Sequence, residues 1–276
     1  MMASSSLGDV GMTIRQAAED LQRLKAAYAS GDMHACEDSL DALKKRLVFL
    51  PTFMDPRAES PTRTQEVMLV REILEHAVLV ATKAQDVDQF ESSFAMLRTY
   101  YHDINGVEGV EPSERRLMIL GLNLLRLLVV QRMAEFHSAL EAIPVADHKS
   151  MFVSMPIRLE RYLMEGSYSR LLNARNEAPS NEFLPLVDKL RDTVRESIAR
   201  CIPDTYVTLS LKDAQKMLMI DSAAEATAFG ERRQWELQGD KFHFPQADDA
   251  AARKELNFKQ LLTESLGTAA QLQQVV

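Results

Sequence analysis

The apolar residues in the first two hundred positions follow the spacing of amphipathic helices. They recur every three or four positions from Ile14 onward, which predicts a helix over residues 13–29. Gly31 then stands where a helix ends, and Asp32 can cap a second helix that continues to Leu47. Two helices joined by so short a turn form an antiparallel helical hairpin.

Two further hairpins follow at similar intervals. Residues 50–64 contain three prolines and predict a connecting loop. Helical spacing returns over residues 67–80 and 90–101, which predicts the second hairpin. A leucine-rich stripe over residues 117–128 and a second apolar stripe over 133–143 predict the third.

A fourth unit completes the helical part of the chain. Pro156 is expected to open a helix that ends at Gly166, and a longer helix over residues 183–202 is expected to stop before Pro203. Successive hairpins of roughly 35 to 45 residues are typical of a helical solenoid. The sequence therefore predicts a mainly α protein with a solenoid of helical hairpins, similar to tetratricopeptide repeats, over residues 13–203.

The pattern changes after Pro203. Ser210 can cap a short helix, and Asp221 or Ser222 can begin a second one that continues to Arg233. Alternating apolar residues on either side of a Gly-Asp loop then predict a β-hairpin; they are Trp235, Leu237, Phe242 and Phe244. Two short helices followed by a hairpin predict a winged-helix module over residues 204–246.

The two ends of the chain differ from each other. Residues 1–12 are small and polar, which predicts a flexible N-terminus. Residues 247–276 are expected to form a linker and an amphipathic helix; its apolar stripe consists of Phe258, Leu262, Leu266, Ala269 and Leu272. This stripe either packs against another protein or folds back on its own chain, and the sequence leaves both interpretations open.

Composition is that of an ordinary folded protein, with 46% hydrophobic and 26% charged residues. Cys36 and Cys201 are too far apart for a metal-binding pair, and two cysteines make no disulfide framework, so reduced thiols inside a cell are expected. The N-terminus lacks the features of a secretory signal. The longest apolar run, residues 117–130, is too short to cross a bilayer. We therefore expect a soluble protein of the cytoplasm and nucleus, without membrane contact.

No known catalytic spacing occurs in the sequence. The six histidines are scattered singly, and there is no phosphate-binding loop, nucleophile elbow or dinucleotide fingerprint. His34 and Cys36 are two positions apart, so they do not face each other on a helix. We predict no catalytic, cofactor-binding or metal-binding residue, and no enzymatic activity.

The winged helix raises the question of nucleic acid. Residues 206–244 carry five basic and six acidic side chains. With this net charge of −1, and −8 for the whole chain, binding to phosphates lacks its usual driving force. We therefore expect no nucleic-acid partner, although a nucleic-acid-binding adaptor stays as the alternative from another class. The exposed edge of the hairpin favours pairing with a strand of another protein.

Several stretches of the sequence resemble one known family. They are Gly-Leu-Asn-Leu-Leu at 121–125, Ala-Glu-Phe-His at 134–137, Leu-Glu-Arg-Tyr-Leu-Met-Glu-Gly-Ser-Tyr at 159–168, residues 209–222, and Trp235 with Gly-Asp-Lys-Phe-His-Phe at 239–244. They resemble the PCI-domain family, whose members occur in the proteasome lid, the COP9 signalosome and a translation-initiation factor complex. Among these the sequence is most similar to a subunit of the 26S proteasome lid.

The resemblance implies assembly rather than catalysis. Lid subunits of this family join through their winged-helix edges, and their C-terminal helices gather in one bundle. By this resemblance, Trp235, Leu237, Phe242 and Phe244 would lie on or beneath the winged-helix sheet and serve as its protein-interaction residues, and the C-terminal stripe would face the bundle. The chain would be a non-catalytic scaffold subunit in a hetero-oligomer that degrades ubiquitinated proteins. A scaffold subunit of the signalosome or of the initiation complex is the alternative within the family.

Overall fold

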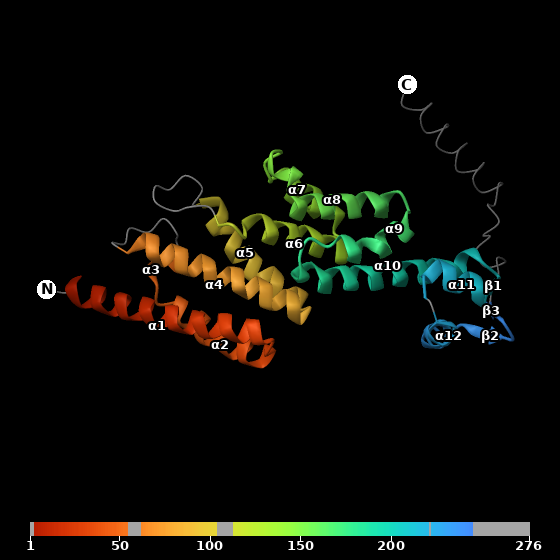
Figure 1. The fold of residues 1–276 in the computed structure, drawn as a ribbon, viewed down its shortest axis with the longest axis horizontal. Helices are drawn as coiled ribbons and strands as arrows, with labels where there is room; N and C mark the ends of the chain where they lie inside the picture. The colour runs from red at the N-terminus through yellow and green to blue at the C-terminus, as the bar shows by residue number, and fades with distance from the viewer. Residues whose placement is uncertain (1–2, 55–61, 104–112, 221, 245–276) are drawn as a thin grey trace, which may run out of the picture. The chain divides into compact units, whose positions relative to one another are not determined.

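The computed structural model describes residues 3–54, 62–103, 113–220 and 222–244 (Figure 1). The chain divides into two compact units, Met1–Thr193 and Val194–Val276. The predicted fold class is confirmed, because the described residues form helices with one small sheet. In the first unit the elements are α1 (Ala3–Ser30), α2 (Met33–Leu47), α3 (Pro51–Met54), α4 (Arg63–Ala84), α5 (Val87–Asp103), α6 (Arg116–Val129), α7 (Met133–Glu141), η1 (Asp147–Lys149), α8 (Met151–Met164), α9 (Tyr168–Leu172), η2 (Asn173–Glu177), η3 (Asn181–Phe183) and the start of α10 (Leu184–Thr205).

The helices of the first unit pack as antiparallel neighbours. Helix α1 lies along α2, and α4 lies along α5 and also contacts both helices of the first hairpin (Figure 1). Helix α6 packs more extensively on α8 than on α7, its neighbour in the chain. Almost every residue from Ile119 to Val129 is buried, so α6 is the central helix of this unit.

Helix ends in this unit are set by local capping residues, among them Gly31 and Asp32 as predicted. Gly31 takes a φ of +80°, a conformation that glycine adopts without steric cost. The Asp32 carboxylate accepts a hydrogen bond from the Ala35 amide at 3.2 Å and so caps α2. The Asp86 carboxylate accepts from the amides of Asp88 and Gln89, both at 3.1 Å, at the start of α5.

Three helix boundaries differ from the prediction. Helix α1 begins at Ala3 rather than at 13, so most of the segment expected to be flexible is helical. Once a helix has formed, each added residue gains a hydrogen bond, and no proline stops α1 from extending. Pro203 lies inside α10 rather than after it. Only one backbone bond is lost there, since the Tyr206 amide still donates to the Ile202 carbonyl at 2.9 Å.

Pro156 also lies inside a helix instead of opening one. It is the sixth residue of α8, where it has no N–H to donate to the carbonyl of Phe152. That carbonyl faces Gly121 of α6, where a Cβ atom would lie only 2.3 Å from the oxygen. Proline and glycine together therefore allow α6 and α8 to approach backbone to backbone.

The second unit is the predicted winged helix with one additional strand. It contains the rest of α10, then β1 (Thr208–Ser210), α11 (Leu211–Leu218), α12 (Ala223–Arg232), β2 (Glu236–Gln238) and β3 (Lys241–His243). The strands form an antiparallel sheet in the order β1-β3-β2. This unit begins at Val194 rather than at 204, because Ala199 and Ile202 of α10 belong to its core.

Candidate protein-interaction surface

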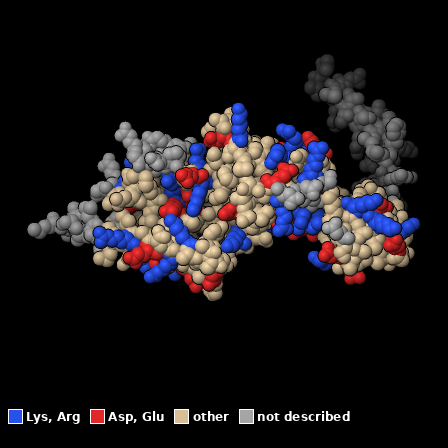
Figure 2. Space-filling model, viewed as in Figure 1, with Lys and Arg blue, Asp and Glu red and all other residues tan. Residues whose placement is uncertain are grey.

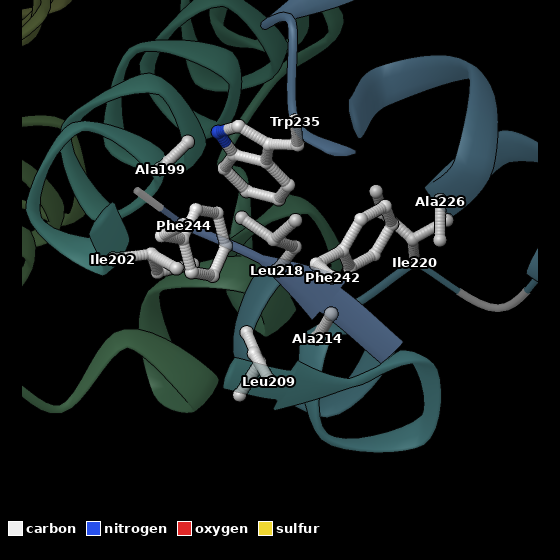
Figure 3. Packing of buried hydrophobic residues seen from close by; sticks show 10 residues of the cluster. All are labelled: Ala199, Ile202, Leu209, Ala214, Leu218, Ile220, Ala226, Trp235, Phe242 and Phe244. Carbon is white, nitrogen blue, oxygen red and sulfur yellow. The ribbon is translucent and has the colours of Figure 1, made fainter. Parts of the chain in front are cut away.

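Aromatic packing around Trp235 holds the winged helix together. Its indole is 8% exposed and lies edge-on to Phe242 and Phe244, with ring centroids 5.3 Å away in both cases (Figure 3). It also lies edge-on to Phe229, with the ring centroids 6.1 Å apart. Such edge-to-face contacts are the preferred arrangement of aromatic pairs. Three of the four predicted winged-helix residues, Trp235, Phe242 and Phe244, therefore lie beneath the sheet, where they fix its position.

A glycine in α12 brings that helix onto the central strand. A Cβ atom at Gly230 would lie 2.6 Å and 2.9 Å from two carbons of the Phe242 ring, closer than such atoms approach in proteins. Arg195 of α10 donates to the carbonyls of Leu218 and Met219 at 3.0 Å and 2.9 Å, which closes the end of α11. Contacts of α12 with β3 and of α10 with α11 thus fix the scaffold that presents the hairpin.

Leu237, the fourth predicted residue, is on the open side of this scaffold. It pairs with Phe242, which pairs in turn with Leu209 on the far strand, so the three side chains form one row on the same face of the sheet. Leu209 and Phe242 are buried, whereas Leu237 on the edge strand β2 is 42% exposed, and the other two residues of β2 are exposed too. The row therefore continues the hydrophobic core out to the surface.

The backbone of Leu237 also faces outward. In an antiparallel ladder, alternate residues direct their N–H and C=O groups to opposite sides. The Phe244 amide donates to the Val207 carbonyl, and the Leu211 amide donates to the Asp240 carbonyl, so Asp240 and Phe244 face β1. The backbone groups of Phe242, which lies between them, therefore also face β1. Those of Lys241 and His243 face β2. Leu237, opposite Phe242, is left with both groups on the free edge. An added strand could therefore form hydrogen bonds there and cover the side chain.

The opposite edge of the sheet was not predicted. Strand β1 is preceded by Tyr206 and Val207, which are 37% and 51% exposed. The signal for this strand was a short run rich in β-branched residues, Val207-Thr208-Leu209, just before the Ser210 cap. Three residues are too few for an alternating pattern, so only the long-range pairing with β3 identifies the strand.

Charge on the winged helix is mixed. Helix α12 carries Glu225, Glu231 and Arg232, and Arg233 forms an ion pair with Glu196 of α10. Acidic and basic side chains are interspersed on the face of the molecule drawn in Figure 2. A helix that reads DNA carries a concentration of lysine and arginine, which α12 does not.

The buried ionisable groups of the first unit have structural partners. The buried carboxylate of Glu66 accepts from the hydroxyls of Thr52 at 2.9 Å and Thr62 at 2.6 Å. Tyr101 donates to the Glu75 carboxylate at 2.9 Å, and burial, together with this carboxylate, raises the pKa of the tyrosine hydroxyl. These contacts fix α3 and α5 against α4, so the polar groups have a structural role.

His76 is the most strongly perturbed histidine with a described pKa shift. It is 4% exposed, and its Nε2 lies 2.8 Å from the Arg115 guanidinium, which can only donate. Burial first, and then the charges of Arg115 and Lys25, lower the pKa of His76 to about 4, against the opposing effect of Glu72. The imidazole is therefore neutral at pH 7 and joins α4 to the residue before α6.

The described residues show neither a metal-binding cluster nor a membrane-spanning helix. Within residues 3–54, 62–103, 113–220 and 222–244, no three His, Cys, Asp or Glu side chains lie close enough to share a metal ion. In the same ranges no helix is both long and apolar enough to cross a membrane. The predicted interaction residues of the C-terminal helix lie outside the described residues; they are Phe258, Leu262, Leu266, Ala269 and Leu272.

Comparison with known proteins gives one consistent family. Residues 114–255 match the model of the CSN8/PSMD8/EIF3K family. The chain is 35% identical over 265 residues to 26S proteasome non-ATPase regulatory subunit 8 homolog A of Arabidopsis thaliana, covering 95% of this chain and 98% of that protein. It is 30% identical to 26S proteasome non-ATPase regulatory subunit 8 of Caenorhabditis elegans, over 89% of this chain and 93% of that one. It is also 30% identical to 26S proteasome regulatory subunit rpn12 of Schizosaccharomyces pombe, over 84% and 83%.

Proposed function

Because the chain belongs to the CSN8/PSMD8/EIF3K family, and matches its 26S proteasome non-ATPase regulatory subunit 8 members over most of its length, we propose that it is a structural subunit of the proteasome regulatory particle. The similarity to these relatives carries the proposal, since it covers both the helical hairpins and the winged helix. The chain acts in the lid, as a non-catalytic scaffold that supports the degradation of ubiquitinated proteins. Similarity to named proteasome subunits favours this complex over the signalosome and the initiation complex.

The structure supports a scaffold in two ways. Its polar groups hold helices together, and the winged helix presents an open strand whose backbone and side chain, both at Leu237, are available to a neighbour. We propose that another lid subunit pairs at this edge and that the C-terminal stripe enters a bundle of helices. Both described cysteines are free thiols, which fits a reducing compartment such as the cytoplasm or nucleus.

Affinity purification of the tagged full-length chain from cell extract tests the function. We expect lid and ATPase-ring subunits of the proteasome in near-equal amounts by mass spectrometry. Recovery of signalosome or initiation-factor subunits instead would overturn the assignment while keeping the fold. Material that disappears after nuclease treatment would favour the nucleic-acid adaptor.

The substitution Leu237→Asp tests the proposed edge. A charge at this exposed position should leave the melting temperature unchanged and reduce recovery of lid subunits about tenfold, because a buried unpaired carboxylate opposes docking. Val145→Asp is the matched control, since Val145 is 78% exposed and lies in the other unit. Equal recovery with both variants would place the contact elsewhere.

A further inference from the structure

The turn between α2 and α3 exposes two large apolar side chains on a fixed backbone. Val48 is 65% exposed and Phe49 is 74% exposed. On either side of them Leu47 and Leu50 are almost completely buried, and the turn is closed by bonds from Phe49 to Arg46 and from Leu50 to Leu47, both 3.0 Å long. The buried leucines anchor the turn and direct the two residues between them outward.

The segment that follows the turn is also held in place. Tyr100 of α5 lies with its hydroxyl 2.9 Å from the carbonyl of Thr52 and 2.8 Å from that of Phe53. Thr52 in turn donates to the buried Glu66. The exposure of Val48 and Phe49 is therefore a property of a braced structure. A surface fixed in its binding conformation loses little entropy when a partner docks.

A third exposed apolar residue comes from α1. Arg46 donates to the Gln16 side chain at 3.4 Å and forms an ion pair with Asp20 at 3.2 Å, so this part of α1 lies beside the end of α2. Met12, about one helical turn before Gln16, is 61% exposed. Apolar residues exposed singly need no explanation, but neighbouring ones on a rigid surface indicate an interaction site.

Basic residues directly precede the exposed Val48 and Phe49 in the last turn of α2. Residues 42–50 contain three bases and no acid, in a chain whose net charge is −8. Arg46 is neutralised by Asp20, whereas Lys44 and Lys45 form no ion pair with another described residue. Three bases in the last turn also favour the helix dipole. The helix dipole can account for the three bases, but it does not account for the exposure of Val48 and Phe49 beyond the helix.

We propose that the surface formed by Met12, Lys44, Lys45, Val48 and Phe49 docks an acidic segment of another subunit of the regulatory particle. An apolar side chain of that segment packs on Val48 and Phe49, and its carboxylates pair with Lys44 and Lys45. Local charge complementarity selects this partner. A membrane fits less well, because a chain with net charge −8 is repelled by an anionic bilayer. The identity of the partner depends on the proposed function, whereas the presence of the exposed surface does not.

Photo-crosslinking in the assembled particle identifies what covers the surface. The full-length tagged chain is made with p-benzoylphenylalanine in place of Phe49, purified with its complex and irradiated. We expect one dominant cross-linked peptide, from another proteasome subunit, with Asp or Glu within a few residues of the attachment. The control carries the same photoreactive residue at Val145, which is 78% exposed and has no basic cluster in sequence beside it.

Charge reversal tests the electrostatic part. Lys44→Glu with Lys45→Glu should lower the cross-linking yield from position 49 about tenfold, while other subunits are still recovered. Lys44→Gln with Lys45→Gln, which introduces no repulsion, should give an intermediate yield and guards against loss of folding in the reversed variant.

Four results would overturn the proposal. They are a yield no higher than at position 145, attachment to residues 55–61 of the same chain, attachment between two differently tagged copies, and attachment to lipid. If the chain purifies without other proteasome subunits, the proposed function fails. If those subunits are present but position 49 does not react with any of them, only the docking proposal fails.

Discussion

At the scale of single residues, Gly121 shows how closely two helices can approach. Any other side chain there would place a carbon 2.3 Å from the Phe152 oxygen and 3.2 Å from the Phe183 ring. The oxygen belongs to the backbone of α8 and cannot rotate away. We expect Gly121→Ala to lower the free energy of unfolding by about 1–3 kcal/mol, the usual cost of overpacking, measured by urea denaturation.

Gly11→Ala is the matched control for this prediction. Gly11 lies within α1, and a Cβ atom there would meet nothing within 4 Å. The substitution should therefore stabilise the chain by about 0.5–1 kcal/mol, as alanine does relative to glycine inside a helix. Destabilisation by both variants would show that the loss does not come from the α6–α8 contact.

His76 makes stability depend on pH in a defined window. Its folded-state pKa of about 4 is below the ordinary value of 6.5, so the unfolded chain binds the proton more readily. The stabilisation that the neutral His76 side chain contributes is fully present above pH 6.5 and is lost as the pH falls toward 4. Between pH 7 and pH 5 the contribution of His76 falls by about 2 kcal/mol.

Urea midpoints at pH 7 and pH 5 measure this effect. His76→Leu should flatten the dependence, although it also removes the acceptor for Arg115 and lowers stability at both pH values. His34→Gln changes a side chain that is 86% exposed and should keep the wild-type slope. An unchanged slope in the His76 variant would mean that other groups carry the pH dependence.

Residue roles could be predicted from sequence where they are local. Asp32, Gly31 and Ser210 act on backbone groups within a few positions, so the pattern around each cap is sufficient. Gly121 and His76 act on partners about thirty or more residues away, and nothing beside them in the sequence indicates those partners. The exposure of Leu237 likewise depends on packing in the folded unit, because Leu209 also lies on an edge strand and is buried.

At the scale of elements, the start of α11 offers a comparison between two caps. The Ser210 hydroxyl accepts from the Asp213 amide at 3.2 Å and donates to the Asp213 carboxylate at 2.6 Å. Ser222, at the start of α12, makes no side-chain capping bond. We expect Ser210→Ala to destabilise the winged helix by about 1 kcal/mol and Ser222→Ala to have a much smaller effect.

Thermal unfolding followed by Trp235 fluorescence measures the difference, since this tryptophan lies in the winged-helix core. The two variants remove the same hydroxyl from the same module, so their difference isolates the capping bond. If both serine variants melt at the same temperature, the Ser210 bonds contribute nothing to stability.

The types and order of the helices could be predicted, but two helix boundaries that were placed at prolines were wrong. A proline most often begins or ends a helix, which gave the expected boundaries at Pro156 and Pro203. In the structure, Pro156 is tolerated because the carbonyl it leaves free faces a glycine. Pro203 is tolerated because it stands two residues before the helix ends. Tertiary packing decides both, and a local pattern contains no information about it.

At the scale of the whole molecule, the fold class followed from periodicity, while the boundary between the units did not. Helix α10 is continuous from Leu184 to Thr205, yet its residues from Val194 onward belong to the second unit. No loop or change of composition marks that division. The division depends on Ala199 and Ile202 packing against the winged-helix core, and only the folded structure shows this.

The C-terminal stripe gives the last prediction at this scale. Its residues lie outside the described ranges, and the sequence allows it either to pack on another subunit or to fold back on its own chain. Leu262→Asp with Leu266→Asp separates the two, because a carboxylate buried without a partner destabilises whichever interface contains it. If the stripe enters a bundle with other subunits, the isolated variant keeps its melting temperature and no longer joins the regulatory particle. If the stripe belongs to the core of this chain, the melting temperature falls sharply, and the failure to assemble then follows from misfolding rather than from a lost contact.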